Sequence, residues 1–309
     1  MHQQTFVTLA IPDKTVSDVL LLAASIRIFG GAQANAPIWV FLPDGLGHLS
    51  TQEKKRFIAL DATIIPCEVD DEEILKFPFA LKVKIASLAE KMSLGKTEFL
   101  IWLDSDTLVL NEPCEFTLAP EKILGYRPVH HRLIGPAWNE VIDPFWELIY
   151  QECGVSVENN FPMFTHTGEK IRPYFNAGTF VIRPEKGLLT EWWQIFQKLY
   201  SVPSFTSFYE KDSRYAIFMH QAVFTGVLLK MLQEKDLQEL SGRINYPLHL
   251  HHEIPPKLRP RTINELTTVR HEDIFDHLAW QESLPIEEPL LGWLKNQLAL
   301  RQSESNHEN

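Results

Sequence analysis

Apolar segments with two different spacings alternate along the first hundred residues. Three short runs rich in strand-forming residues are typical of β-strands: 5–11, 37–42 and 62–69. Three other stretches have the length and spacing of helices: 16–29, a short one from about residue 50, and 80–92. Because strands alternate with helices, the pattern predicts a mostly parallel sheet with helices on both faces, an α/β/α sandwich.

The run Phe99–Leu103 consists of five consecutive apolar residues. Such a run suits a strand that is buried on both faces, so we expect it at the centre of the sheet. Further elements are expected later in the chain: strands at 122–126, 180–183 and 266–270, and helices at 188–200, 221–233 and 290–300. Residues 127–173 show no clear periodicity, and we interpret them as an insertion over the edge of the sheet.

No internal repeat or low-complexity linker divides the chain. We therefore predict a single domain over residues 1–300. The polar segment 301–309 is expected to be a disordered tail.

The composition excludes several classes of partner. The formal net charge is -11 at pH 7, so no broad basic field exists for a nucleic acid or an anionic membrane. The three cysteines are widely spaced and form neither a CxxC metal pair nor a disulfide framework. There is no signal-peptide pattern and no apolar run of about 18 residues, so we expect no transmembrane segment and a cytoplasmic location.

Two aspartates, Asp104 and Asp106, directly follow the buried run. In an extended backbone, residues two apart project to the same side, so the two carboxylates are expected to converge. Open α/β sheets bind ligands at the carboxyl ends of their strands, and carboxylate oxygens suit Mg²⁺ or Mn²⁺ that also bridges a diphosphate. Asp-x-Asp alone is common in solvated turns, but here it interrupts a segment that continues as an apolar run over Thr107–Leu110.

Phosphatases of the haloacid dehalogenase type also place Asp-x-Asp after a buried strand. In that class a threonine stands two positions beyond the second aspartate, and the motif lies near the N-terminus. Here Thr107 directly follows Asp106, and about three strand–helix units come first. The spacing therefore argues against a phosphatase.

Two segments carry a resemblance to a known family. Lys82–Leu88 followed by Phe99–Val109 resembles the central helix and Asp-x-Asp strand of GT-A glycosyltransferases of the glycogenin and lipopolysaccharide galactosyltransferase group. Tyr174–Ile182 resembles the Phe-Asn-Ala-Gly strand of that group, in the right order and separation. The resemblance covers about residues 5–275. It implies a GT-A fold in which residues 1–110 bind the nucleotide and 127–173 help to form the acceptor site.

The resemblance also implies roles for individual residues. Asn176 and Ala177 are expected to line the donor-sugar pocket, and Lys82 to contact the donor diphosphate or ribose. The Asn176 amide suits sugar hydroxyls, and Gly178 allows backbone and ligand to approach closely. The other expected donor contacts are Ala10, Asp104, Ser105 and Asp106.

The third metal ligand of the resembled group is a histidine late in the chain. His271 directly follows the strand predicted at 266–270, so it is the expected ligand beside the two aspartates. Neutral imidazole is a good ligand for Mn²⁺ in such a setting. A nearby cluster is the alternative: His249, His251 and His252.

One pair of residues departs from the resembled group. Where that group has Asp-Gln at the start of a helix, this chain has His220-Gln221. We expect both residues to take part in catalysis, although His220 removes a carboxylate. The group's Lys-Pro-Trp after the late histidine is replaced by Glu272–Ile274. The donor sugar and the choice between retention and inversion therefore stay open.

The sequence thus predicts an enzyme, a glycosyltransferase that uses Mn²⁺ or Mg²⁺. It would move a sugar from a nucleotide sugar, expected to be a UDP-sugar, to a carbohydrate, lipid or small-molecule acceptor. A sugar-phosphate nucleotidyltransferase is one alternative, but its Gly-rich loop is missing from Ala10–Thr15. A non-catalytic nucleotide-sugar-binding protein is the other, because of the change at His220.

Overall fold

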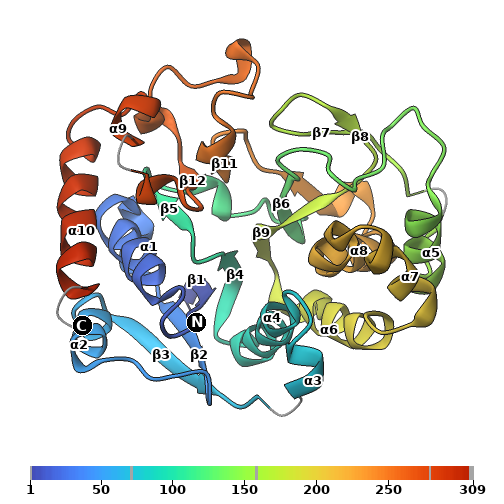
Figure 1. The fold of residues 1–309 in the computed structure, drawn as a ribbon, viewed down its shortest axis with the longest axis horizontal. Helices are drawn as coiled ribbons and strands as arrows, with labels where there is room; N and C mark the ends of the chain where they lie inside the picture. The colour runs from blue at the N-terminus through green and yellow to red at the C-terminus, as the bar shows by residue number, and fades with distance from the viewer. Residues whose placement is uncertain (1, 70–71, 157–158, 278–279, 306–309) are drawn as a thin grey trace.

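The fold is built around one seven-stranded sheet (Figure 1). A computed structural model describes residues 2–69, 72–156, 159–277 and 280–305. The strands of the large sheet lie in the order β10-β6-β9-β4-β1-β2-β3. A smaller sheet has the order β11-β12-β5, and β7 pairs with β8.

The strands and helices have the following bounds. The strands are β1 (His2–Leu9), β2 (Ile38–Pro43), β3 (Ala62–Cys67), β4 (Thr97–Leu103), β5 (Thr107–Val109), β6 (Leu124–Pro128), β7 (Met163–Phe164), β8 (Lys170–Ile171), β9 (Phe175–Ile182), β10 (Leu237–Glu239), β11 (Tyr246–Pro247) and β12 (Thr268–Arg270). The helices are α1 (Val16–Phe29), α2 (Thr51–Ala59), α3 (Glu72–Leu75), α4 (Ala80–Ser93), α5 (Pro144–Cys153), α6 (Leu188–Leu199), α7 (Pro203–Lys211), α8 (Ser213–Met231), α9 (Trp280–Ser283) and α10 (Leu290–Ser305).

The central position predicted for 99–103 is confirmed, because β4 lies in the middle of the large sheet. Its side chains alternate between two cores. Leu100 and Trp102 pack in the core beside α4, α6 and α8, while Ile101 and Leu103 pack in the core beside α1. A strand covered on both faces needs apolar residues at every position, which explains the unbroken run.

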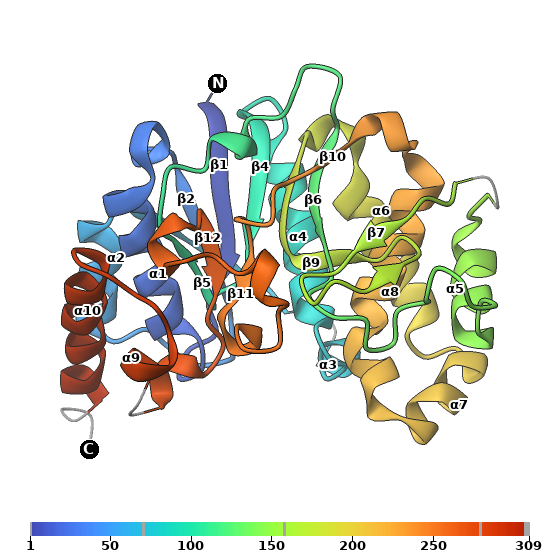
Figure 2. The same cartoon turned by 90° about the horizontal axis from the view of Figure 1, so that it is seen from above.

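The helices form a layer on each face of the sheet, as predicted for an α/β/α sandwich. Figure 2 shows α1, α2 and α10 on one side and α6 and α8 on the other. Most neighbouring strands are parallel: β1 with β2 and β4, β2 with β3, and β6 with β10. The mostly parallel sheet expected for a GT-A fold is therefore confirmed.

Strand β9 is the exception, because it runs antiparallel to both β4 and β6. Thr179 pairs with Leu103, the last residue of β4. Since β9 runs in the opposite direction, its first residues lie beyond the carboxyl end of β4. This register brings Asn176–Gly178 beside the Asp104 backbone, whose N–H donates to the Gly178 carbonyl at 2.8 Å.

The small sheet positions β12 and the residue after it near the carboxyl end of β4. β12 pairs antiparallel with β5, and Arg270 lies opposite Thr107. The backbone N–H of His271 donates to the Asp106 carbonyl at 2.9 Å. Arg270 and His271 therefore lie next to the Asp-x-Asp segment, although more than 160 residues separate them in sequence.

A buried carboxylate joins the helix that carries Lys82 to its neighbour. Helix α6 begins after Gly187, which has no side chain for an N-cap. Glu90 on α4 takes that role, because its oxygens accept from the backbone N–H groups of Leu189 at 3.0 Å and Thr190 at 2.7 Å. The contact fixes α4 against α6.

The C-terminal helix confirms the helix expected at 290–300. It continues to Ser305, so the disordered tail predicted from Arg301 is wrong for residues 301–305. Residues 306–309 lie outside the described part of the chain. Within that part, no helix is long and apolar enough to cross a membrane.

Candidate active site

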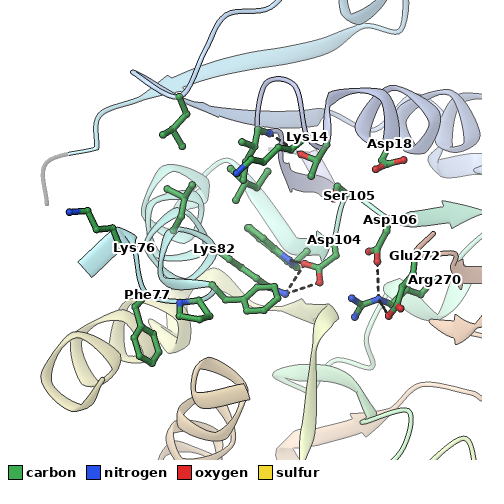
Figure 3. A pocket seen from close by; sticks show the side chains of 18 residues that line it. Lys14, Asp18, Lys76, Phe77, Lys82, Asp104, Ser105, Asp106, Arg270 and Glu272 are labelled. Carbon is green, nitrogen blue, oxygen red and sulfur yellow. Dashed lines mark hydrogen bonds and ion pairs between the residues drawn. The ribbon is translucent and has the colours of Figure 1, made fainter. Parts of the chain in front are cut away.

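A cavity of about 710 Å³ opens at the carboxyl ends of β1 and β4 (Figure 3). We call it the donor cavity. It is lined by the whole Asp-x-Asp segment, by Lys82, and by Phe77, Phe79 and Trp102. Charged residues from distant parts of the chain complete it: Lys14, Asp18, Lys76, Arg270 and Glu272.

Asp104 is held by two donors inside this cavity. The Lys82 Nζ lies 2.7 Å from Oδ1 and 2.8 Å from Oδ2 of Asp104. The Trp102 indole N–H also donates to Oδ1, at 2.9 Å. Both partners are fixed by regular structure, Lys82 by α4 and Trp102 by β4. The carboxylate is therefore positioned before any ligand binds.

Asp106 faces a different cation. The Arg270 Nε lies 2.9 Å from Asp106 Oδ2, and also 3.2 Å from Glu272 Oε1. Figure 3 shows Asp104 directed toward Lys82, and Asp106 directed toward Arg270. The site is thus two carboxylate–cation pairs side by side.

The backbone at Asp104–Asp106 is not extended, contrary to the prediction. β4 ends at Leu103, and the Thr107 N–H donates to the Asp104 carbonyl at 3.1 Å, which closes a turn. Residues two apart in a turn do not share a direction as they do in a strand. This turn explains why each carboxylate faces its own cation.

Burial and charge shift the protonation equilibria of these groups. Burial lowers the pKa of Lys82, although Asp104 opposes that shift. Burial works against the charged form of Asp106, but Arg270 outweighs it and holds its pKa below the ordinary value. Burial likewise opposes the charge of Arg270, yet Asp106, Asp104 and Glu272 raise its pKa. Asp106 and Arg270 thus form a charged pair at neutral pH.

His271 lies against Asp106 and presents one free nitrogen. Its Nδ1 lies 2.8 Å from the Glu272 carbonyl, which can only accept, so Nδ1 carries the proton and Nε2 is the acceptor. His271 Nε2 and Asp106 Oδ1 are both buried without a hydrogen-bond partner among the described residues. Two orphaned acceptors of this kind suit a hard divalent cation.

The donor set of a metal is nevertheless incomplete in this arrangement. Among the described residues, no group of three or more His, Cys, Asp or Glu side chains closes on one point. Asp104, the third expected ligand, is held by Lys82 and Trp102 instead. Asp106 and His271 therefore fit a metal as two protein ligands.

Two histidines of the alternative cluster, His251 and His252, have partners outside the donor cavity. His251 Nδ1 is 2.9 Å from the Tyr246 hydroxyl, and His252 Nε2 is 3.0 Å from the Ser283 carbonyl. His249 faces Glu272 at 3.6 Å. His271 is the histidine joined directly to Asp106, by a backbone hydrogen bond.

The Asn-Ala-Gly segment of β9 lies beside Asp104. A Cβ added to Gly178 would lie 3.0 Å from Asp104 Oδ2 and 3.5 Å from Arg270 Nη1, so a side chain here would crowd both ion pairs. The Asn176 Oδ1 accepts from the Gly178 N–H at 2.7 Å, which fixes the Asn176 side chain. The segment therefore borders both ion pairs, although its residues are not among those that line the donor cavity.

Of the other expected residues, Ser105 lines the donor cavity, whereas Ala10, His220 and Gln221 are not among its lining residues. His220 stacks on Phe79, with ring centroids 4.4 Å apart, and burial lowers its pKa well below the ordinary value. The Gln221 Oε1 accepts from the Ala177 N–H at 3.0 Å. Ala10 is fully buried, whereas Ser105 lines the cavity. The catalytic roles of His220 and Gln221 stay predictions.

The sequence did not predict five charged residues of the cavity: Lys14, Asp18, Lys76, Arg270 and Glu272. Arg270 and Glu272 are the sequence neighbours of His271. The prediction of His271 as a metal ligand could therefore have indicated that both lie at the site. Lys14 and Asp18 belong to the turn after β1 and the first turn of α1. That position is where parallel α/β sheets bind ligands, but only the fold shows which side chains face the cavity.

Comparison with known protein families identifies the class of enzyme. Residues 9–213 match the Rhodobacterales glycosyltransferase domain. The chain belongs to this glycosyltransferase family, and the prediction that it is a glycosyltransferase is confirmed. No curated protein matches it.

Solved structures with a similar fold include three glycosyltransferases. GlyE of Streptococcus pneumoniae TIGR4 has a TM-score of 0.49 and 13% identity over 92% of this chain, which spans 60% of GlyE. Mouse xyloside xylosyltransferase 1 has a TM-score of 0.45 and 13% identity, with 88% of this chain and 97% of that chain covered. The galactosyltransferase LgtC has a TM-score of 0.46 and 16% identity, with 90% and 94% covered.

Proposed function

We propose that this glycosyltransferase transfers a sugar from a nucleoside diphosphate sugar, and that this donor is a UDP-sugar. We also propose that the reaction takes place in the donor cavity. The observation that carries the proposal is the pair of ion pairs, Lys82–Asp104 and Arg270–Asp106, in one cavity at the carboxyl end of β4. Ligands of open α/β sheets bind at this edge.

The cations of the cavity suit a diphosphate. Lys82 and Arg270 each face a carboxylate, and Lys14 makes no side-chain hydrogen bond or ion pair with any described residue. Guanidinium and ammonium groups form charge-assisted hydrogen bonds to phosphate oxygens. As the bond from the sugar to the diphosphate breaks, these groups lie where negative charge builds up on the leaving group, and they stabilise it.

Mn²⁺ or Mg²⁺ would be held by Asp106 Oδ1 and His271 Nε2, while Asp104 keeps its contacts with Lys82 and Trp102. When bound, the ion neutralises charge on the leaving diphosphate. The proton on His271 Nδ1 is fixed by the Glu272 carbonyl, which keeps Nε2 available as an acceptor.

The sugar is expected beside β9. Asn176 is 4% exposed, and its oxygen is used by Gly178, so its amide N–H₂ remains to donate to a sugar hydroxyl. Phe77, Phe79 and Trp102 supply aromatic faces in the donor cavity for a base or a sugar ring.

Donor hydrolysis tests the proposal. Purified protein is incubated with UDP-glucose, UDP-galactose, UDP-N-acetylglucosamine and GDP-mannose, with Mn²⁺ or with a chelator, and release of nucleotide diphosphate is measured. We expect slow release from a UDP-sugar that depends on the metal. Release from GDP-mannose alone would contradict the assignment of UDP, and equal rates with the chelator would contradict the metal.

A further inference from the structure

A second cavity, of about 830 Å³, lies between the predicted insertion and the C-terminal part of the chain. Its walls come from the segments 239–246 and 254–266, from Phe164–His166 next to β7, and from Arg127 on β6. Figure 1 shows β7 and β11 at the same end of the molecule. This cavity shares no lining residue with the donor cavity, so it is a separate site.

The second cavity is basic in an acidic protein. Five cationic side chains line it: Arg127, Arg243, Lys257, Arg259 and Arg261. The lining contains two carboxylates, Glu239 and Glu265, which leaves a formal excess of three positive charges. Because the whole chain carries -11, this positive charge is local. It suits one anionic group, since a long polyanion would also meet the acidic remainder of the surface.

Two donors in the cavity have no partner. The Lys257 ammonium makes no hydrogen bond or ion pair within the described part of the chain. Arg127 is 6% exposed; its Nη1 donates to Glu239 Oε1 at 3.0 Å, whereas its Nε is buried and unpaired. Buried donors nearly always have an acceptor, so a ligand oxygen is expected at Arg127 Nε.

Two buried histidines, His130 and His166, and the half-buried His249 separate the two cavities. The ring centroids of His130 and His166 are 5.3 Å apart, and those of His130 and His249 are 6.1 Å apart. His166 lines the second cavity, while His249 lies 3.6 Å from Glu272 of the donor cavity. The histidine row thus links one cavity to the other.

The histidine row is polar and uncharged. Burial lowers the pKa of His166 to about 3 and that of His249 to about 4, and it lowers the pKa of His130 well below the ordinary value. His130 Nε2 and His249 Nδ1 are buried without a hydrogen-bond partner. Neutral imidazoles both donate and accept, so the wall between the two cavities is polar and has unused hydrogen-bonding capacity.

We propose that the second cavity binds an anionic group of the acceptor, a phosphate ester or a carboxylate, while an acceptor hydroxyl reaches the donor cavity. The proposal rests on the proposed function, because it names the class of acceptor. In the transfer step the acceptor oxygen bonds to the anomeric carbon of the donor, whose bond to the diphosphate oxygen breaks. The electron pair leaves with the diphosphate, and the hydroxyl proton passes to water.

Binding of inorganic phosphate tests the cavity without any transfer. NMR titrations compare the wild-type protein with Lys257→Gln, Arg127→Lys, Lys14→Gln in the donor cavity, and Lys198→Gln on the exposed face of α6. We expect Kd for phosphate to rise roughly tenfold in the Lys257 and Arg127 variants, because each loses a charge-assisted contact. Lys198→Gln should bind as the wild type. Weaker binding in Lys14→Gln alone would overturn the proposal, since it would place the phosphate in the donor cavity.

A transfer assay then separates this proposal from the proposed function. A hexose 6-phosphate, a glucuronic acid and a neutral hexose are compared as acceptors for the donor that is hydrolysed. We expect the two anionic acceptors to be preferred, and their preference over the neutral hexose to fall roughly tenfold in Lys257→Gln. Donor hydrolysis without any preference for an anionic acceptor would overturn the acceptor proposal. Absence of donor hydrolysis would contradict the proposed function, and the phosphate titration would still decide on the cavity.

Discussion

The ammonium of Lys82 contacts both carboxylate oxygens of Asp104, at 2.7 and 2.8 Å, and both side chains are largely buried. This ion pair holds Lys82 on α4 against Asp104, the first residue after β4, in the donor cavity. The two groups depend on each other, since burial lowers the Lys82 pKa and Asp104 counteracts that shift.

Asp104→Asn should therefore cost stability as well as activity. The change leaves a buried ammonium without its counter-charge, which costs roughly 3 kcal/mol of unfolding free energy. Lys82→Met combined with Asp104→Asn removes both charges and should recover most of the loss. Urea denaturation of the two single variants and the double variant measures this coupling. Additive losses would show that the two residues do not interact.

Arg270 should matter for the donor diphosphate. Arg270→Gln keeps a planar amide but removes the charge beside Asp106, so kcat/KM for the donor should fall roughly 10- to 100-fold. Arg270→Lys keeps the charge without the two-nitrogen fork and should lose less. Initial rates at varied donor concentration give both values. Equal losses in the two variants would mean that shape, and not charge, is what the site needs.

Glu90 should stabilise the fold through the α6 N-terminus. Glu90→Ala leaves the N–H groups of Leu189 and Thr190 buried without acceptors, and we expect a loss of about 3 kcal/mol. Glu90→Gln keeps one oxygen and should lose about half as much. The matched control is Glu191→Ala on α6, which removes a partly exposed ion pair with Lys230 and should cost less than about 1 kcal/mol. Urea denaturation of the three variants measures these losses of unfolding free energy.

The buried histidines should make the fold sensitive to acid. Burial lowers the pKa of five histidines in the folded state: His130, His166, His220, His249 and His251. Since the unfolded chain binds their protons near pH 6.5 and the folded chain does not, stability is full above that pH and is lost as the pH falls. Each contributes up to about 1.4 kcal/mol per pH unit.

Unfolding free energies between pH 7 and pH 5 test this acid sensitivity. The slope of the unfolding free energy against pH should be shallower in His166→Gln than in the wild type, by up to about 1.4 kcal/mol per pH unit. His48→Gln, which changes an exposed side chain, should keep the wild-type slope. An unchanged slope in His166→Gln would show that this histidine already carries its proton in the folded protein.

Local patterns were sufficient to predict the layers and the centre of the sheet. The run Phe99–Leu103 was identified as a central strand because burial on both faces leaves no polar position. Helix α8 begins at Ser213, well before the predicted start at Gln221, because the Asp212 side chain accepts from the Arg214 N–H and caps it. That cap is a local signal that the sequence contains.

Contacts between distant segments could not be read from the sequence. The Asp-x-Asp segment was found, but its turn and its separate cations were not, because Arg270 reaches Asp106 through the β5–β12 register. The antiparallel direction of β9, which brings Gly178 to Asp104, also depends on pairing between remote strands. Hydrophobic periodicity fixes which face of a strand is buried, but not which strand lies beside it.

The most direct test of the donor cavity is the affinity for UDP, measured by isothermal titration calorimetry with Mn²⁺ and with a chelator. The wild-type protein should bind UDP more tightly with Mn²⁺. Asp106→Asn and His271→Ala should each lose that gain, because each removes one of the two orphaned acceptors, while His252→Ala should retain it. The contradicting result would be a wild-type UDP affinity that is the same with Mn²⁺ and with the chelator, and that does not change in Asp106→Asn. This cavity would then not be a metal-assisted donor site.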